Sequence, residues 1–194
     1  MTRHRPGWRR EYAKARTGTM VNGGALVQDE VIDVFVEVPK GSRNKYEVDR
    51  NTGRIYLDRV LFTSTHYPAD YGFIMDTLAD DGDNLDALVL MEDPTFSGCI
   101  IRARPIAMLE MWDEKGRDQK VLCVPMNAPQ WDWARDLNDI PENLRREIAH
   151  FFSVYKELEG KPSEVGDWSG KRQAIETIHE ARRRQSGQAE DGGC

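Results

Sequence analysis

A dense succession of short strand-like segments between residues 31 and 124 limits the possible folds of this chain most strongly. In residues 31–38, β-branched side chains alternate with polar ones. A tight turn at Asn51-Thr-Gly53 joins two further strand candidates, residues 45–49 and 54–61. The other candidates are 86–91, 99–112 with a bend at a proline, and 120–124. Strands at this close spacing indicate an antiparallel barrel or a tightly coiled sheet.

The hydrophobic period changes from strand-like to helical after residue 140. Apolar side chains then recur at steps of four and three residues, at Leu144, Ile148, Phe151, Tyr155 and Leu158. Pro141 at the start and Gly160 past the end bound this predicted helix. A weaker helical pattern covers 171–185, with Ile175 and Ile178 inward. A β-rich body followed by two helices predicts an α+β domain.

Charge is distributed unevenly along the 194 residues, which suffice for one domain. Residues 1–28 carry a net charge of +5, and the remainder carries −11. We expect residues 1–28 to be a basic, disordered extension, 29–185 the folded domain, and 186–194 a flexible tail. An organelle transit peptide is an alternative for the extension. A nucleic-acid-binding arm ranks last, because the acidic body would repel phosphate backbones.

Several classes of protein are excluded by composition. No apolar stretch approaches the roughly 20 residues of a membrane span, and the N-terminus lacks the apolar core of a secretory signal. The cysteines are three in number and show no CxxC spacing, so Cys99 and Cys123 are predicted to be buried free thiols. We therefore expect a cytoplasmic protein without a membrane partner, with organelle import as the alternative if residues 1–28 are a transit peptide.

Clustered carboxylates mark the candidate chemistry. Four aspartates fall within residues 80–86, and a loop that tolerates such repulsion normally holds a hard cation. A solvated acidic turn is the alternative, and the position of Gly82 excludes an EF-hand. A second acidic loop spans 113–120. Lys45 and Glu47 leave one face of a strand, where a plain salt bridge is the simpler interpretation.

A colinear set of motifs covers roughly residues 31–180. The segments are Val36-Glu37-Val38-Pro39, Lys45-Tyr46-Glu47, Asp58-Arg59-Val60, Tyr67-Pro-x-x-Tyr71-Gly72, Asp81-Gly-Asp83-x-x-Asp86, Asp113 with Asp118-x-Lys120, and His150-Phe-Phe with Tyr155-Lys156. In this order and spacing they resemble the soluble inorganic pyrophosphatases of family I, the single-barrel type. The resemblance implies a β-rich α+β fold, an OB-like closed five-stranded antiparallel β-barrel with two C-terminal helices packed against it.

The resemblance also implies an enzyme, an inorganic diphosphatase. Its reaction would be Mg²⁺-dependent hydrolysis of pyrophosphate to two orthophosphates by direct attack of a metal-activated water. The implied cofactor is Mg²⁺, about two to four ions, with Mn²⁺ or Co²⁺ as substitutes. The implied partners are pyrophosphate, phosphate and further copies of the chain, with a hexamer favoured over a dimer.

Site roles carry over residue by residue as implications of the same resemblance. Asp83 matches the general base. The matched metal ligands are Asp81, Asp86, Asp113 and Asp118, and the outer carboxylates are Glu37 and Glu47. The matched phosphate-binding groups are Lys45, Arg59, Tyr67, Tyr71, Lys120, Tyr155 and Lys156. Asn84 and Met75 stand where the family commonly has proline, and we expect Asn84 to make the acidic loop less rigid without removing a ligand.

The electrostatics of this site require cations. The matched carboxylates and basic groups sum to −3, and two Mg²⁺ ions would bring the site to +1, so metal is needed before pyrophosphate can bind. An OB-type nucleic-acid binder is a competing hypothesis, but it would interleave aromatics with basic residues rather than with acids. A calcium-binding module would not need Lys45, Arg59 and Lys120. A phosphohydrolase of another substrate, such as a nucleotide, is a further alternative.

Overall fold

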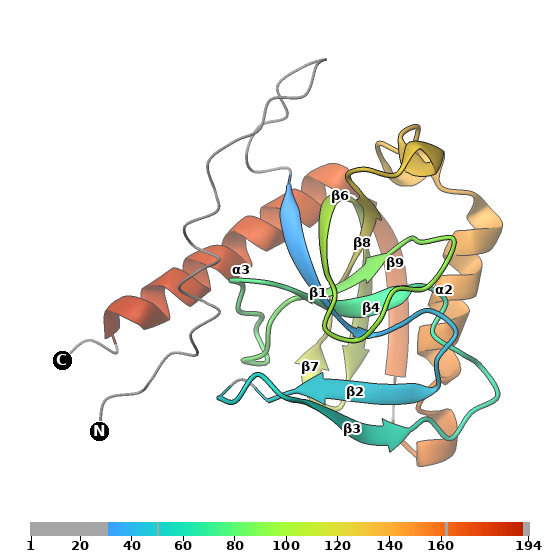
Figure 1. The fold of residues 1–194 in the computed structure, drawn as a ribbon, viewed down its shortest axis with the longest axis horizontal. Coiled ribbons are helices and arrows are strands. Elements are labelled where there is room, and N and C mark those ends of the chain that lie inside the picture. The colour runs from blue at the N-terminus through green and yellow to red at the C-terminus, as the bar shows by residue number, and fades with distance from the viewer. Residues whose placement is uncertain (1–30, 50, 162, 192–194) are drawn as a thin grey trace.

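The computed structural model describes residues 31–49, 51–161 and 163–191, so the expected extension 1–28 lies outside the described residues. Five strands form a closed ring, in which each strand pairs with the next and the last pairs with the first (Figure 1). In ring order they are β1 (Ile32–Val38), β4 (Asp70–Ile74), β5 (Asp86–Val89), β8 (Lys120–Pro125) and β6 (Ile100–Asp113). The expected five-stranded OB-like barrel is confirmed.

One pairing departs from the expected antiparallel arrangement. β5 and β8 run parallel, whereas the other four neighbours in the ring run antiparallel. The reason is the number of strands: an odd number cannot alternate in direction all the way around a closed ring. The expectation of a purely antiparallel barrel is therefore wrong for this pair.

The remaining strands lie outside the ring. β2 (Asn44–Val48) and β3 (Ile55–Val60) form the expected hairpin, whose turn is closed by the Gly53 amide donating to the Asp49 carbonyl at 2.7 Å. β7 (Gly116–Arg117) pairs with the end of β6, and β9 (Ser163–Gly170) pairs along β6. The long strand β6 changes register after Pro105, which confirms the expected bend.

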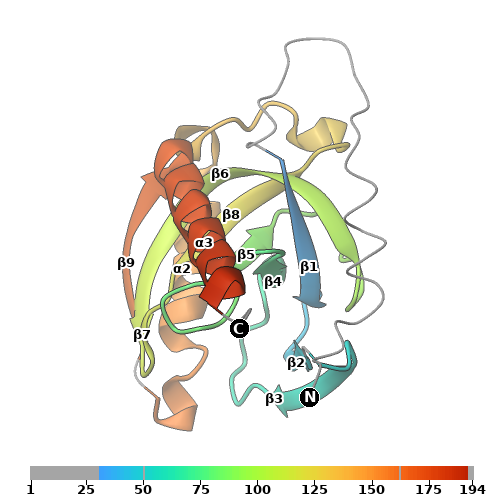
Figure 2. The ribbon, with the colours of Figure 1, turned by 90° about the vertical axis from the view of Figure 1, so that its left-hand side faces the viewer.

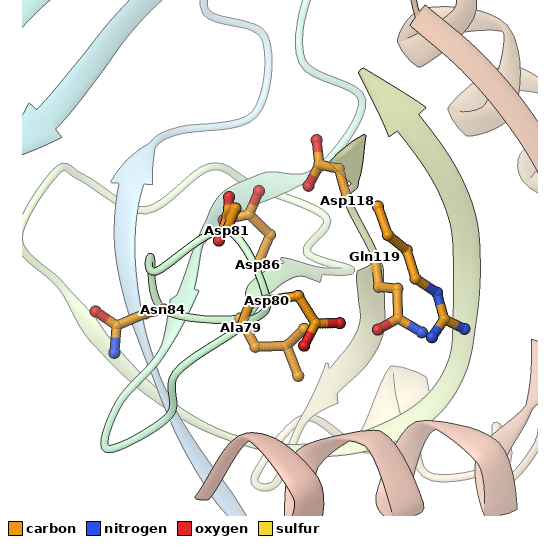
Figure 3. A pocket seen from close by; sticks show the side chains of 9 residues that line it. Ala79, Asp80, Asp81, Asn84, Asp86, Asp118 and Gln119 are labelled. Carbon is orange, nitrogen blue, oxygen red and sulfur yellow. The ribbon is translucent and has the colours of Figure 1, made fainter. Parts of the chain in front are cut away.

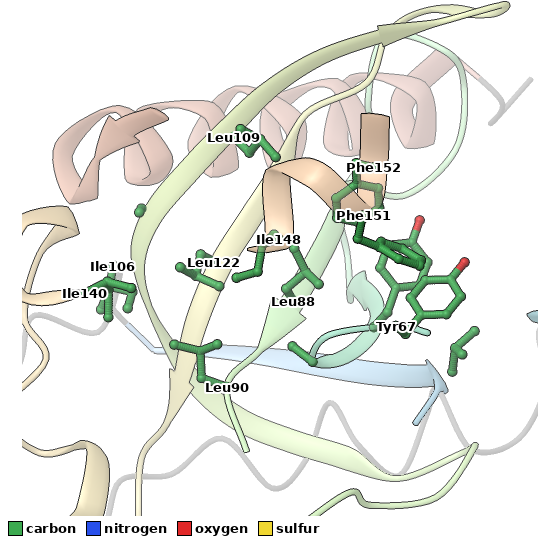
Figure 4. Close-up of a cluster of buried hydrophobic side chains, with 14 of the residues drawn as sticks. Tyr67, Leu88, Leu90, Ile106, Leu109, Leu122, Ile140, Ile148, Phe151 and Phe152 are labelled. Carbon is green, nitrogen blue, oxygen red and sulfur yellow. The ribbon is translucent and has the colours of Figure 1, made fainter. Parts of the chain in front are cut away.

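Alternation along the ring strands separates two apolar clusters. Ala87 and Val89 of β5 belong to a cluster that the five ring strands form with buried residues near the C-terminus. The intervening Leu88 points the other way, into a second cluster, called here the outer cluster, which the same five strands form with the helix α2 (Glu142–Val154). Figure 4 shows Leu88, Leu122, Ile148 and Phe152 in this outer cluster.

Two helices pack on opposite sides of the barrel, as Figures 1 and 2 show. α2 ends at Val154 and a 3₁₀ turn η4 (Glu157–Glu159) follows, so Leu158 is 61% exposed rather than inward as predicted. α3 (Lys171–Asp191) continues six residues past its predicted end into the segment expected to be a tail. Ile178 of α3 is buried as predicted, whereas Ile175 is half-buried.

The segment between β8 and α2 contains two short 3₁₀ turns, η2 (Pro129–Trp131) and η3 (Leu137–Asp139). Buried Arg104 donates to the carbonyls of Trp131, at 2.7 Å, and Ala134, which fixes this segment to β6. Within the described residues, no helix combines the length and apolar character needed to cross a membrane.

Candidate active site

Two acidic loops meet at one end of the barrel. Asp86 and Lys120 are the first residues of β5 and β8, and they lie opposite each other in the register of this parallel pair. The loops that precede these strands, residues 79–85 and 114–119, therefore open at the same end. Asp86 and Lys120 leave the same face of the sheet as Leu88 and Leu122, so the site borders the outer apolar cluster.

Three of the predicted metal-ligand carboxylates line one narrow pocket at this end. Asp81 and Asp86 come from the first loop and its strand, and Asp118 from the second. Figure 3 shows these three carboxylates on the same side of the first loop, with Asn84 pointing away. The remaining lining residues are Ala79, Asp80, Asn84, Leu85, Arg117 and Gln119. Residues about 30 positions apart in the sequence are thus brought together as predicted.

Lys120 lies between two of these carboxylates. Its side chain is 2% exposed and its Nζ forms ion pairs with Asp86 and Asp118. Burial alone would lower the pKa of Lys120, but the two carboxylates outweigh burial and raise it. Burial raises the pKa of Asp118, which Lys120 opposes. In this arrangement Lys120 neutralises buried carboxylates, and its contact with a phosphate stays a prediction.

The predicted tyrosines form the wall beside Lys120. Tyr71 donates its hydroxyl proton to Asp86 at 2.5 Å, and its ring lies 5.0 Å from that of Tyr67. Tyr155, at the C-terminal end of α2, packs against Phe151 with tilted rings and against Phe152 edge to face. Burial raises the pKa of all three phenols, so each hydroxyl stays protonated at neutral pH. The site therefore contains uncharged hydrogen-bond donors.

Asp113 and Lys156 form a separate pair. Lys156 Nζ lies 2.8 Å from Asp113 and 3.3 Å from Glu114. Burial opposes ionisation of Asp113, but its hydrogen bond with Lys156 holds its pKa below the usual value. Burial would lower the pKa of Lys156, yet Tyr155 and Asp113 raise it. Asp113 does not line the pocket of the other three aspartates, and this agrees with its assignment to a further ion.

The β2–β3 hairpin carries two of the predicted basic residues, and Lys45 on β2 lies directly opposite Arg59 on β3. Lys45 pairs with Glu47, which is 55% exposed, and lies 3.6 Å from Asp58. Arg59 Nη1 lies 2.6 Å from Asp58, and its Nε 3.2 Å from Glu159 of η4. The expected Lys45–Glu47 salt bridge is present, and Arg59 links the hairpin to the segment after α2.

Glu37 joins the hairpin to the barrel. One carboxylate oxygen of Glu37, on β1, accepts the Val48 amide of β2 at 3.1 Å. Burial raises the pKa of Glu37 to about 7, and the nearby charge of Asp86 adds to this effect. Glu37 is therefore the one predicted outer carboxylate that lies within the fold, whereas Glu47 lies on its surface.

Hydrogen bonds within the first acidic loop hold its shape. The Ala79 amide donates to the Asp83 carbonyl at 2.7 Å, and the Asp83 amide to Asp81 Oδ1 at 3.0 Å. Asn84 Nδ2 donates to the Thr77 carbonyl at 2.7 Å, so Asn84 supplies a side-chain tie across the loop. The side chain of Asp83 is 52% exposed and lies 3.3 Å from Lys115 Nζ.

The chemistry of the carboxylates in the pocket suits a hard divalent cation. Among the described residues, no group of three or more His, Cys, Asp or Glu side chains is arranged closely enough to enclose an ion. The pocket nevertheless offers the carboxylate oxygens of Asp81, Asp86 and Asp118, and neither His nor Cys is among the residues that line it. Mg²⁺ prefers such oxygens and keeps several waters, so it does not need a closed protein cage.

Sequence reasoning missed the ionic partners of the predicted residues. Glu159 pairs with Arg59, Glu114 with Lys156, and Lys115 with Asp83. Glu114 and Lys115 follow Asp113 directly in the chain, and this proximity is the signal that could have found them. Glu159 lies 100 residues from Arg59, and only the packing of the hairpin against η4 brings the two together.

Comparisons with known proteins agree with this geometry. A family model described as inorganic pyrophosphatase matches residues 34–186. The protein named inorganic pyrophosphatase from Streptomyces coelicolor is 56% identical over 153 residues, 78% of this chain and 94% of that relative. The protein of the same name from Methanosarcina acetivorans is 51% identical over 159 residues, 82% and 95% of the two chains. A crystal structure of inorganic pyrophosphatase from Thermus thermophilus has a TM-score of 0.80 and 42% identity, covering 86% and 97%.

Proposed function

The chain belongs to the inorganic pyrophosphatase family, and from this premise we propose that its acidic pocket hydrolyses pyrophosphate to two orthophosphates with Mg²⁺, by direct attack of water. The observation that carries the proposal is the meeting of Asp81, Asp86 and Asp118 around one pocket with Lys120 between the last two. Acidic and basic groups so placed suit a reaction whose substrate is a polyanion and whose cofactor is a cation.

Cation binding is supported by the charge of the pocket. Lys120 compensates only part of the negative charge of the three aspartates, and pyrophosphate would be repelled by the rest. Divalent ions held by these carboxylates, with a further one at Asp113, would neutralise the substrate and lower the pKa of the attacking water. The carboxylate oxygens of the pocket favour Mg²⁺, with Mn²⁺ or Co²⁺ as substitutes.

Asp83 is the proposed general base. Its side chain is 52% exposed, and its backbone is fixed by bonds to Asp81 and Ala79. Asp83 does not line the pocket itself but lies in the loop that does, and an exposed carboxylate there can accept a proton from water and release it. Lys115 Nζ lies 3.3 Å from the Asp83 carboxylate and is its ionic partner in the free site.

Basic and phenolic groups around the pocket are proposed to hold the two phosphoryl halves. Lys45 and Arg59 would bind from the hairpin, and Lys156 from the segment after α2, each exchanging its carboxylate partner for phosphate oxygens. Tyr67, Tyr71 and Tyr155 would donate uncharged hydrogen bonds, since burial keeps them protonated. Lys120 is proposed to contact phosphate once cations replace it between Asp86 and Asp118.

Release of phosphate tests the proposal directly. The full chain is incubated with pyrophosphate in Mg²⁺ and in a chelator, and ATP serves as the control substrate. We expect phosphate release from pyrophosphate in Mg²⁺ alone, with ATP hydrolysed far more slowly. Equal rates with ATP would favour a phosphohydrolase of different specificity, and release in the chelator would contradict the role given to the carboxylates.

Assembly and location complete the proposal. We propose a homo-oligomer, hexamer favoured over dimer, and its support beyond the family is a set of exposed apolar side chains on and after β3: Tyr56, Leu57, Val60 and Phe62. Light scattering with size-exclusion chromatography measures the oligomer mass. A cytoplasmic location is proposed from the free thiols Cys99, half-buried, and Cys123, buried. Cell fractionation tests it.

A further inference from the structure

The C-terminal helix contacts the first acidic loop through one arginine. Arg184 Nη1 donates to the Leu78 carbonyl at 3.0 Å, and Nη2 lies 3.0 Å from Asp80 Oδ1. A backbone bond lies beside these contacts, because the Leu78 amide donates to the Ala181 carbonyl at 3.0 Å. The start of the loop is thus attached to α3 at three points, more than 100 residues away in the chain.

The packing of α3 places Arg184 at this position. Ala174, Ile178 and Ala181 are fully buried and recur at steps of four and three residues, so they form the face that packs on the barrel. Arg184 follows Ala181 by three and continues this face beyond the apolar cluster. Its guanidinium therefore emerges at the edge of the barrel, where the loop begins at the largely buried Leu78.

Asp80 is oriented differently from the other acidic residues of the loop. Its carboxylate pairs with Arg184, and Figure 3 shows it directed away from the side on which Asp81, Asp86 and Asp118 gather. The next residue is Asp81, and the Asp83 amide bonds to its carboxylate. The direction of Asp81 therefore depends on where the backbone at residues 78–80 is held.

We propose that Arg184 is a positioning residue, which holds the Leu78–Asp80 backbone against α3 so that Asp81 and Asp86 face the pocket in which a divalent cation would bind. Arg184 itself does not touch the substrate. The inference rests on the proposed function only in taking the pocket as a cation site. It gives the helix after the barrel a role in the site in addition to its packing.

Magnesium affinity distinguishes positioning from simple electrostatics. Replacement of Arg184 by Gln removes a positive charge near the pocket, and by charge alone this would strengthen cation binding. Positioning predicts the reverse, a loss of affinity of about fivefold, the order expected when one or two charge-assisted contacts are lost. The sign of the change therefore separates the two effects.

The test titrates Mg²⁺ alone into the full chain by calorimetry and compares wild type, Arg184→Gln and Arg184→Lys. Arg183→Gln, an exposed arginine on the same helix, is the matched control. Amide hydrogen exchange of Leu78, Ala79 and Gly82 is measured in chelator, because these amides bond to Ala181, Asp83 and Ala79. We expect weaker Mg²⁺ binding and faster exchange in Arg184→Gln, an intermediate result in Arg184→Lys, and no change in the control.

An affinity equal to or tighter than that of Arg183→Gln, or unchanged exchange at Leu78 and Ala79, would overturn the role of Arg184. If Arg184→Gln does not fold, Arg184→Lys decides, because it keeps the charge but lacks the two separate terminal nitrogens that contact Leu78 and Asp80. None of these measurements uses pyrophosphate. If the wild-type protein binds Mg²⁺ but releases no phosphate, the proposed function fails and the role of Arg184 stands. If the protein does not bind Mg²⁺, the amide hydrogen exchange rates measured in chelator still test the role of Arg184.

Discussion

The surroundings of Asp83 set it apart from Asp86 and Asp118, which border the buried Lys120. Its backbone, not its side chain, closes the loop, through its amide to Asp81 and its carbonyl to Ala79. Asp83→Asn should therefore keep the fold and Mg²⁺ binding while hydrolysis falls by about 10²- to 10⁴-fold, the usual contribution of a general base.

Phosphate release and calorimetric Mg²⁺ titration measure these two effects separately. Asp93→Asn, in an exposed loop, serves as the control and should retain full activity. Turnover of Asp83→Asn within a few fold of wild type would remove Asp83 from the mechanism.

Glu37 should make stability depend on pH. Its pKa is about 7 in the folded chain against an ordinary value of 4.5, so the folded state binds the proton more tightly. The free energy of unfolding should then fall as pH rises from about 4.5 to 7, by about 3 kcal/mol in total. Glu37→Gln keeps an acceptor for the Val48 amide and carries no charge.

Glu37→Gln should therefore be more stable than wild type by about 3 kcal/mol at pH 8, and by under about 1 kcal/mol at pH 5. Urea unfolding in chelator measures the difference, with Glu176→Gln on the exposed face of α3 as the control. A gain that is the same at both pH values would contradict the assignment.

At the scale of secondary structure, the contact between β1 and β4 depends on Gly72. A Cβ at this position would lie 1.9 Å from the Phe35 carbonyl oxygen, which is backbone of the neighbouring strand and cannot move aside. Gly72→Ala should destabilise the barrel by more than about 3 kcal/mol.

The same substitution at Gly187 supplies the matched control, because no atom lies within 4 Å of a Cβ there. Gly187 lies in α3, so Gly187→Ala should raise stability by about 0.5–1 kcal/mol. Thermal unfolding compares the two. A fold that tolerates Gly72→Ala at no cost would mean that β1 and β4 can separate.

Strands marked by alternation, by a continuous apolar run or by a tight turn were predictable from sequence, whereas β4 and β9 were not. β4 is buried on both faces apart from Phe73 and has no period to detect. β9 contains two glycines and few apolar residues, and its strand form depends on pairing with β6. The early end of α2 could not be predicted either. Leu158 continues the helical spacing of apolar residues in the sequence, although α2 has already ended and the chain forms the 3₁₀ turn η4.

At the scale of the whole molecule, the family match begins at residue 34, well after the basic segment. We therefore propose residues 29–185 as the catalytic domain and predict that removal of residues 1–28, which lie outside the described residues, leaves kcat and KM within about twofold of wild type. Steady-state phosphate release measures both. A large loss would show that the segment contributes to the site or the assembly.

Most of the candidate site could be located from sequence, because the acidic and basic motifs lie in short, recognisable segments. Their ionic partners could not. The pairs Arg59–Glu159 and Arg184–Asp80 each join segments about 100 residues apart, and no local pattern specifies which surfaces will meet. Lys120 between two carboxylates was likewise beyond sequence reasoning, since its burial depends on the packing of Phe152 and Tyr71 beside it.

The parallel contact of β5 with β8 has a consequence for how such a pocket can arise at all. Had the ring contained an even number of strands, every neighbour could have reversed direction, and the segments entering β5 and β8 would have approached from opposite poles. Asp81 and Asp118 would then be separated by the height of the barrel. The odd number of strands in the ring is thus what allows two distant stretches of chain to line a single pocket.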